Sequence, residues 1–273
     1  MKMKVKQVLV STLILSIAML SCKKSSYNQA PRTFVLVHGA WQAPFVWDSV
    51  KAQLSRAGQN VIVVQLPGHG TDSTSPATIT MNSYRDQIVS AINSVNGKVI
   101  LVGHSLSGFA ISAVEEEIPS RIDKLVFLAA YIPSAGQTPY SLSISDGQTH
   151  VKPPALIPDL TEGLLGIAND SIVPIFCPDA PAGLQAKVVA NYRPDPAIPF
   201  TDSVPITKAN FGSADKYYIH TMQDEVIGID LQDQMVQTAG ITKVYSLNTS
   251  HCPFLSQPDS VTAILSTIAG IQH

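Results

Sequence analysis

Short apolar runs alternate with helix-spaced segments along this chain, and that alternation constrains its fold more than any other feature. Residues 33–37 and 61–66 are apolar and rich in β-branched side chains, as buried parallel strands are. Residues 45–57 and 84–95 carry apolar side chains at helical spacing and end close to a glycine. The pattern predicts an α/β fold, with a mostly parallel central sheet and helices on both faces.

The alternation is interrupted once. It continues through a strand at 99–102, a helix at 109–117 and a strand at 125–130, and it resumes with strands at 217–221 and 243–247 and helices at 229–238 and 258–269. Between the two halves, 12 of the 19 prolines fall within residues 132–205. We therefore expect a core built from residues 33–130 and 215–273, with residues 131–214 inserted as a separate segment.

The N-terminus has the features of an export signal. Lys2, Lys4 and Lys6 precede an apolar run over residues 8–20, which predicts a signal peptide at 1–21 followed by a polar tether at 22–32. Ser21 and Cys22 close the run as in a bacterial lipobox, although the motif is not strictly met. We expect Cys22 to be lipidated and the protein to lie in the bacterial cell envelope, lipid-anchored or periplasmic. Ordinary cleavage beside an incidental Cys22 thiol is the alternative.

Composition excludes several classes of protein. The chain is 45% apolar and 14% charged with a net charge of -2, which argues against disorder and against a nucleic-acid partner. Cys177 and Cys252 alone remain after the tether, so no disulfide framework is expected. His69 has no second ligand at metal spacing and is expected to be an ordinary loop histidine. No metal and no cofactor is expected.

The strongest chemical signal is a serine between a strand and a helix. Residues 103–108 read GHSLSG directly after the strand at 99–102. A nucleophile on such a sharp turn needs small neighbours, and the usual pattern is G-x-S-x-G. Here Ser107 takes the place of the second glycine, and Gly108 follows one residue later. The pattern predicts that Ser105 is a nucleophile; the alternative is a helix N-cap serine.

A serine nucleophile requires a histidine base that a carboxylate orients. His251 lies in the loop between the last strand and the last helix, which places it at the carboxyl edge of the sheet beside Ser105. The acid should follow the preceding strand. We predict Asp224, with Glu225 as the competitor.

Two backbone N–H groups should hold the oxyanion of an acyl-transfer reaction. Leu106 follows the nucleophile, and Ala40 lies in the His-Gly-Ala segment after the first strand, where Gly39 allows a close approach. We count Gly39 and His104 as candidate substrate-binding residues, although the ring of His104 is expected to point away from the turn.

These motifs together resemble the α/β-hydrolase superfamily. The similarity rests on FVLVHGAW at residues 34–41, a second tryptophan at Trp47, GHS after VILV, and Asp224 and His251 in that order. It covers roughly residues 33–270 and is nearest to plant methylesterases and hydroxynitrile lyases with their bacterial esterase relatives. The resemblance implies that residues 131–214 cap the active site. It also implies a serine esterase whose partner is a small, uncharged ester, and it leaves the oligomeric state open.

Two positions separate the chemistries of that branch. Lyases of this type carry Thr in place of the Gly in the His-Gly-Ala segment and Lys directly after the catalytic His. This chain has Gly39 and Cys252 there, so the resemblance favours ester hydrolysis. A C–C hydrolase or a hydroxynitrile lyase-like enzyme on the same triad remains an alternative. A non-catalytic ligand-binding envelope protein is another, and it predicts a lesion in the triad that the sequence does not contain.

Overall fold

The computed structural model describes residues 30–271, and the chain from Pro31 onward forms one compact unit. The predicted signal peptide, Cys22 and the tether up to residue 29 lie outside the described residues. Among the helices of residues 30–271, none combines the length and the apolar character needed to cross a bilayer.

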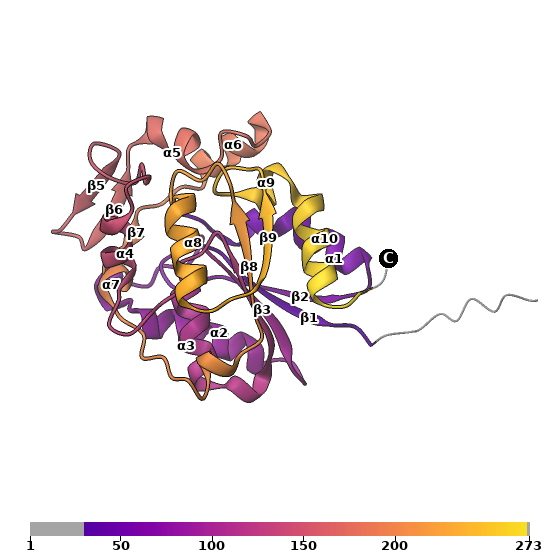
Figure 1. The fold of residues 1–273 in the computed structure, drawn as a ribbon. Helices are drawn as coiled ribbons and strands as arrows, with labels where there is room; N and C mark the ends of the chain where they lie inside the picture. The colour runs from indigo at the N-terminus through magenta and orange to yellow at the C-terminus, as the bar shows by residue number, and fades with distance from the viewer. Residues whose placement is uncertain (1–29, 272–273) are drawn as a thin grey trace, which may run out of the picture. The chain divides into compact units, whose positions relative to one another are not determined.

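A six-stranded parallel sheet forms the core of this unit (Figure 1). Its strands are β1 (Thr33–Val37), β2 (Asn60–Val64), β3 (Val99–His104), β4 (Ile122–Leu128), β8 (Lys216–Thr221) and β9 (Lys243–Leu247), in the spatial order β2-β1-β3-β4-β8-β9. Every neighbouring pair is parallel, which confirms the predicted fold class. β1 and β3 are fully buried, but β2 is partly exposed because it is an edge strand, so the expectation of a buried strand there was wrong.

Helices cover both faces of the sheet. Figure 1 shows α1 and α10 on one side and α2, α3 and α8 on the other. These helices and the short ones beside them are η1 (Pro44–Trp47), α1 (Asp48–Arg56), η2 (Pro76–Thr78), α2 (Met81–Asn93), α3 (Ser107–Glu117), η3 (Pro119–Arg121), α8 (Ile229–Thr238), α9 (Pro253–Ser256) and α10 (Pro258–Ile268). α2 begins three residues before the predicted start because Thr80 and Ser83 form a capping box at its N-terminus.

Residues 131–214, which we call the cap segment, contain more regular structure than the sequence suggested. The segment holds α4 (Pro139–Ser145), β5 (Leu156–Asp159), β6 (Leu164–Ile167), α5 (Asn169–Phe176), α6 (Ala182–Ala190), β7 (Asp195–Pro196), α7 (Ile198–Thr201) and η4 (Phe211–Ser213). β5, β6 and β7 form a small antiparallel sheet. Prolines occupy the first turns of α4 and α7, where no backbone N–H is needed. Pro174 is the exception, because it lies inside α5.

The order of the strands reverses between β1 and β3. The chain runs from β1 outward to β2 and then returns to the other side of β1 to form β3. In open parallel sheets, ligands bind beyond the carboxyl ends of the strands at such a reversal. The loops that leave this point begin at His38 and at Ser105.

Candidate active site

Ser105 lies on a strained turn between β3 and α3. Its φ angle is 55°, a left-handed conformation that side-chain-bearing residues rarely adopt. The Ser105 carbonyl accepts hydrogen bonds from the N–H groups of Gly108 (3.0 Å) and Tyr131 (3.1 Å), which hold the turn. Such a turn matches the strained strand-to-helix bend on which acyl-transfer enzymes of this architecture carry their serine.

The departure from G-x-S-x-G has a structural reason. A Cβ atom on Gly108 would lie 1.9 Å from the Tyr131 carbonyl oxygen, so no other residue fits there. Ser107 is small enough for its own position, and its hydroxyl donates a hydrogen bond to the His38 carbonyl. The required glycine is therefore one residue later than usual, and Ser107 ties the turn to the loop after β1.

The loop after β1 approaches the turn closely at Gly39. A Cβ atom there would lie 2.7 Å from the Ser105 Cβ and 2.9 Å from the His104 Nδ1. Beside this contact, the N–H groups of Ala40 and Leu106 donate no hydrogen bond to any residue of the described part of the chain. Both donors are free to bind an oxyanion.

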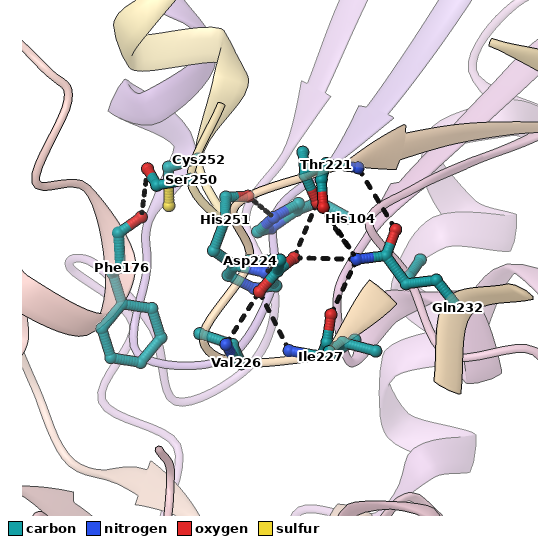
Figure 2. A network of polar contacts seen from close by, with 12 residues as sticks. His104, Phe176, Thr221, Asp224, Val226, Ile227, Gln232, Ser250, His251 and Cys252 are labelled. Atoms are coloured by element: carbon teal, nitrogen blue, oxygen red, sulfur yellow. Dashed lines mark hydrogen bonds and ion pairs between the residues drawn. The ribbon is translucent and has the colours of Figure 1, made fainter. Parts of the chain in front are cut away.

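His251 carries the features of a general base. Its Nδ1 lies 2.8 Å from the Asp224 Oδ2 (Figure 2). Because a carboxylate accepts, Nδ1 carries the proton in the neutral ring and Nε2 keeps its lone pair. Nε2 is buried without a hydrogen-bond partner among residues 30–271. In this tautomer, Nε2 can accept a proton from a serine hydroxyl.

Asp224 rather than Glu225 is the carboxylate that binds His251. The other close donors to Asp224 are the N–H groups of Val226 (2.8 Å) and Ile227 (2.9 Å) and the Thr221 hydroxyl (2.7 Å), as Figure 2 shows. Glu225 instead pairs with His150 at 2.9 Å, and both side chains are about half exposed. The buried carboxylate is thus held by several donors that stabilise its charge.

The expectation that His104 points away was wrong. Its ring centroid lies 4.4 Å from that of His251, and its Nε2–H donates to the His251 carbonyl at 2.9 Å. Burial, with a contribution from the neighbouring histidines, holds the pKa of His104 well below its ordinary value. The neutral His104 ring therefore packs against the His251 ring. The ring of Phe176 also lies near it, with a centroid distance of 6.0 Å. Whether His104 also touches substrate stays a prediction.

Several residues around the site were not found from the sequence. Gln42 accepts the Gly39 N–H at 3.4 Å and donates to the Cys252 Sγ at 3.0 Å, which links the loop after β1 to the His251 loop. Gln232 donates to the Ile227 carbonyl and braces the loop of Asp224. A lone glutamine carries no motif, so no pattern could have indicated either one.

An apolar cavity of about 620 Å³ lies next to the loop after β1. Trp41, which follows Ala40, forms part of its wall, and the rest comes from the cap segment. The large apolar wall residues include Tyr140, Ile144, Leu156, Leu165 and Phe200. Asp146 and Lys152 also line the cavity, so its walls are mostly but not entirely apolar. Such walls suit an organic group with a large apolar part.

Comparisons with known proteins agree with this architecture. Residues 34–264 match the Alpha/beta hydrolase family. A chloroplastic Arabidopsis thaliana protein assigned to the methylesterases is 31% identical over 249 residues, which are 87% of this chain and 64% of that protein. This chain therefore spans less than two thirds of that relative's length. The Arabidopsis thaliana alpha-hydroxynitrile lyase is 26% identical, with 86% of this chain and 96% of the lyase covered.

The fold recurs in a solved structure. The crystal structure of polyneuridine aldehyde esterase superposes with a TM-score of 0.77 at 21% identity, covering 88% of this chain and all (100%) of that one. At this identity the likeness concerns the fold alone. The family match covers most of the chain, and its relatives come from the branch that the sequence motifs indicated. The chain belongs to the Alpha/beta hydrolase family.

Proposed function

We propose that this protein is a serine esterase that cleaves small, uncharged carboxylic esters with Ser105, His251 and Asp224 as its triad. The observation that carries the proposal is the state of His251, whose Nδ1 is bonded to Asp224 while its buried Nε2 has no partner among the described residues. Ser105, on its strained turn, directly follows His104, whose ring centroid lies 4.4 Å from that of His251, and it is the hydroxyl that this base would serve. The esterases among the relatives support the same chemistry.

The reaction follows from these roles. The Ser105 Oγ attacks the ester carbonyl carbon while His251 Nε2 takes its proton, and the N–H groups of Ala40 and Leu106 hold the resulting oxyanion. When the tetrahedral intermediate collapses, the C–O bond to the alcohol breaks and the alcohol leaves with the proton from His251. Water then attacks the acyl-enzyme, His251 takes a proton from that water and returns it to Ser105, and the carboxylic acid departs.

The residue at position 252 argues against cyanohydrin cleavage. A lyase must stabilise a leaving cyanide, and a lysine beside the catalytic histidine supplies that charge in the related lyases. Here Cys252 is buried, and burial raises the pKa of its thiol well above the ordinary value, so the side chain stays a neutral thiol. A cysteine cannot supply the positive charge that a lysine would. The close contact of Gly39 with Ser105 also leaves no room for a threonine side chain there.

The test is a parallel assay of one preparation on an aryl acetate and on mandelonitrile, with Ser105→Ala as the blank. We expect a burst of phenol in proportion to enzyme, and a loss in kcat on the order of 10³-fold or more in Ser105→Ala. Wild-type ester turnover by folded Ser105→Ala would refute the mechanism. Cyanide release above the blank without ester hydrolysis would assign a lyase instead. No turnover, together with no labelling by a serine-reactive fluorophosphonate, would assign a binding protein.

We also propose that the mature protein is anchored by a lipid on Cys22 in a bacterial envelope. The proposal rests on the basic start, the apolar run over 8–20 and the Ser-Cys pair that follows it. One lipidated cysteine would hold the active site near the membrane without a spanning helix.

A further inference from the structure

The small sheet of the cap segment binds both the backbone and the side chain of Trp41. Its backbone N–H donates to the Asp195 Oδ2 at 2.6 Å, and its indole Nε1–H donates to the Leu165 carbonyl at 2.7 Å. Leu165 and Asp195 are partners in the pairing of β6 with β7. One pair of neighbouring residues in this sheet, Leu165 and Asp195, therefore holds the residue that follows Ala40.

These two hydrogen bonds stabilise an unfavourable backbone conformation of Trp41. Its φ angle is 57°, in the left-handed region that a tryptophan avoids without support. The peptide before it carries the Ala40 carbonyl, and that peptide turns with the Trp41 backbone. If Trp41 relaxed, the orientation of the neighbouring Ala40 N–H would change with it.

Asp195 makes this contact as half of a buried ion pair. Asp195 is fully buried at 0% exposure, and its Oδ2 lies 2.8 Å from the His69 Nε2. The His69 Nδ1–H donates to the Pro67 carbonyl at 2.9 Å, so both ring nitrogens face acceptors and the ring carries both protons. Burial alone lowers the pKa of His69, but the Asp195 carboxylate outweighs it and the net pKa is raised.

The same histidine also contacts the loop after β1 directly. The ring centroids of His69 and His38 lie 4.9 Å apart. His38 is neutral, because burial and the neighbouring His69 lower its pKa to about 3. Its Nδ1–H donates to the Gly39 carbonyl at 2.9 Å and its Nε2 accepts the Leu66 N–H. His69 and Asp195 thus brace residues 38–41 from two sides.

We propose that Asp195 and His69 are positioning residues for the oxyanion site, acting through Trp41 on the direction of the Ala40 N–H. This inference rests on the proposed function, since it assumes that the Ala40 N–H binds an oxyanion. It gives the cap segment a part in the rate of the reaction, besides any part in enclosing the substrate.

The experiment compares three variants of the full chain on an aryl acetate. Asp195→Ala removes the acceptor of the Trp41 N–H, and kcat should fall about 10-fold or more with KM little changed, because the lost stabilisation belongs to the transition state. Affinity for a boronic acid inhibitor should fall in parallel. Asp195→Asn keeps an oxygen acceptor and should recover most of kcat. Asp202→Ala is the matched control, since Asp202 is another cap carboxylate that accepts a core N–H, that of Met81 at 2.8 Å.

The outcomes separate this inference from the proposed function. The positioning role would be overturned if folded Asp195→Ala kept the wild-type kcat, or if KM alone changed. An equal fall in kcat in Asp202→Ala would overturn it as well. If Asp195→Ala does not fold, His69→Ala decides, because it removes both the donor to Asp195 and the ring that packs against His38. We expect a lower kcat at unchanged KM, and a wild-type kcat would overturn the inference. Ester turnover by Ser105→Ala would instead defeat the proposed function itself.

Discussion

Gly39→Ala should damage catalysis without removing any functional group. The added Cβ would lie 2.7 Å from the Ser105 Cβ, 2.9 Å from the His104 Nδ1 and 3.2 Å from the His104 carbonyl oxygen. The φ angle of Gly39 lies outside the left-handed region, so the substitution acts through this contact alone.

The size of the effect follows from these distances. Non-bonded carbon atoms rest at about 3.5–4.0 Å, so the pair at 2.7 Å must separate by roughly 0.8 Å or more. Neither neighbour is the free end of a flexible side chain, because Ser105 sits on a strained turn and His104 is hydrogen-bonded to His251. A displacement near 1 Å in a catalytic site costs about 10²-fold in rate. Overpacking should also cost about 1–3 kcal/mol of unfolding free energy.

The assay is kcat on an aryl acetate, with the concentration of reactive serine determined by fluorophosphonate titration. Gly183→Ala is the matched control, because a Cβ on Gly183 would meet nothing within 4 Å. It should leave kcat unchanged. Gly39→Ala that folds and keeps kcat within about threefold of wild type would refute the claim that this contact sets the geometry of the site.

Three further predictions concern the acid, the buried ion pair and the anchor. In Asp224→Asn the amide oxygen should stay with the Val226 and Ile227 N–H groups, which turns the NH₂ toward His251 and forces the wrong tautomer; kcat should fall about 10³–10⁴-fold, and a loss below tenfold would contradict this. The raised pKa of His69 means that its ion pair stabilises the fold fully below the unfolded value near 6.5 and less as pH rises through the folded value. The free energy of unfolding of wild type, measured with urea, should therefore fall as pH rises from about 6.5 through the folded value, and that of His69→Gln should not; equal pH slopes would contradict the charge assignment. Cys22→Ser should release the protein from membranes or block its processing, and a membrane-bound variant of normal mature mass would exclude the lipid anchor.

The repetitive part of the fold could be predicted because it follows local patterns. α8 (Ile229–Thr238) and β9 (Lys243–Leu247) begin and end where the apolar spacing indicated, and the serine turn follows β3 as the glycine pattern required. The cap segment obeys no such period. Its helices are short, and although β5 and β6 form a local hairpin, β6 pairs with β7 across the two helices between them. Its many prolines therefore masked structure that tertiary contacts help to create.

The same distinction separates the reacting groups from the residues that position them. Serine, histidine and carboxylate at the ends of successive strands are recognisable because the sheet brings those ends together. Several of the supporting contacts come from the cap segment, and the one between Trp41 and Asp195 spans 154 residues. Its carboxylates accept backbone N–H groups from all three loops, with Asp195 binding Trp41, Asp146 binding Gly228 and Asp179 binding Ser250. An aspartate in a loop carries no sequence sign of its acceptor role, because the donor is an ordinary peptide N–H. The loop after β1, the loop of the acid and the loop of the base therefore each depend on a contact from the cap segment in addition to their contacts within the core.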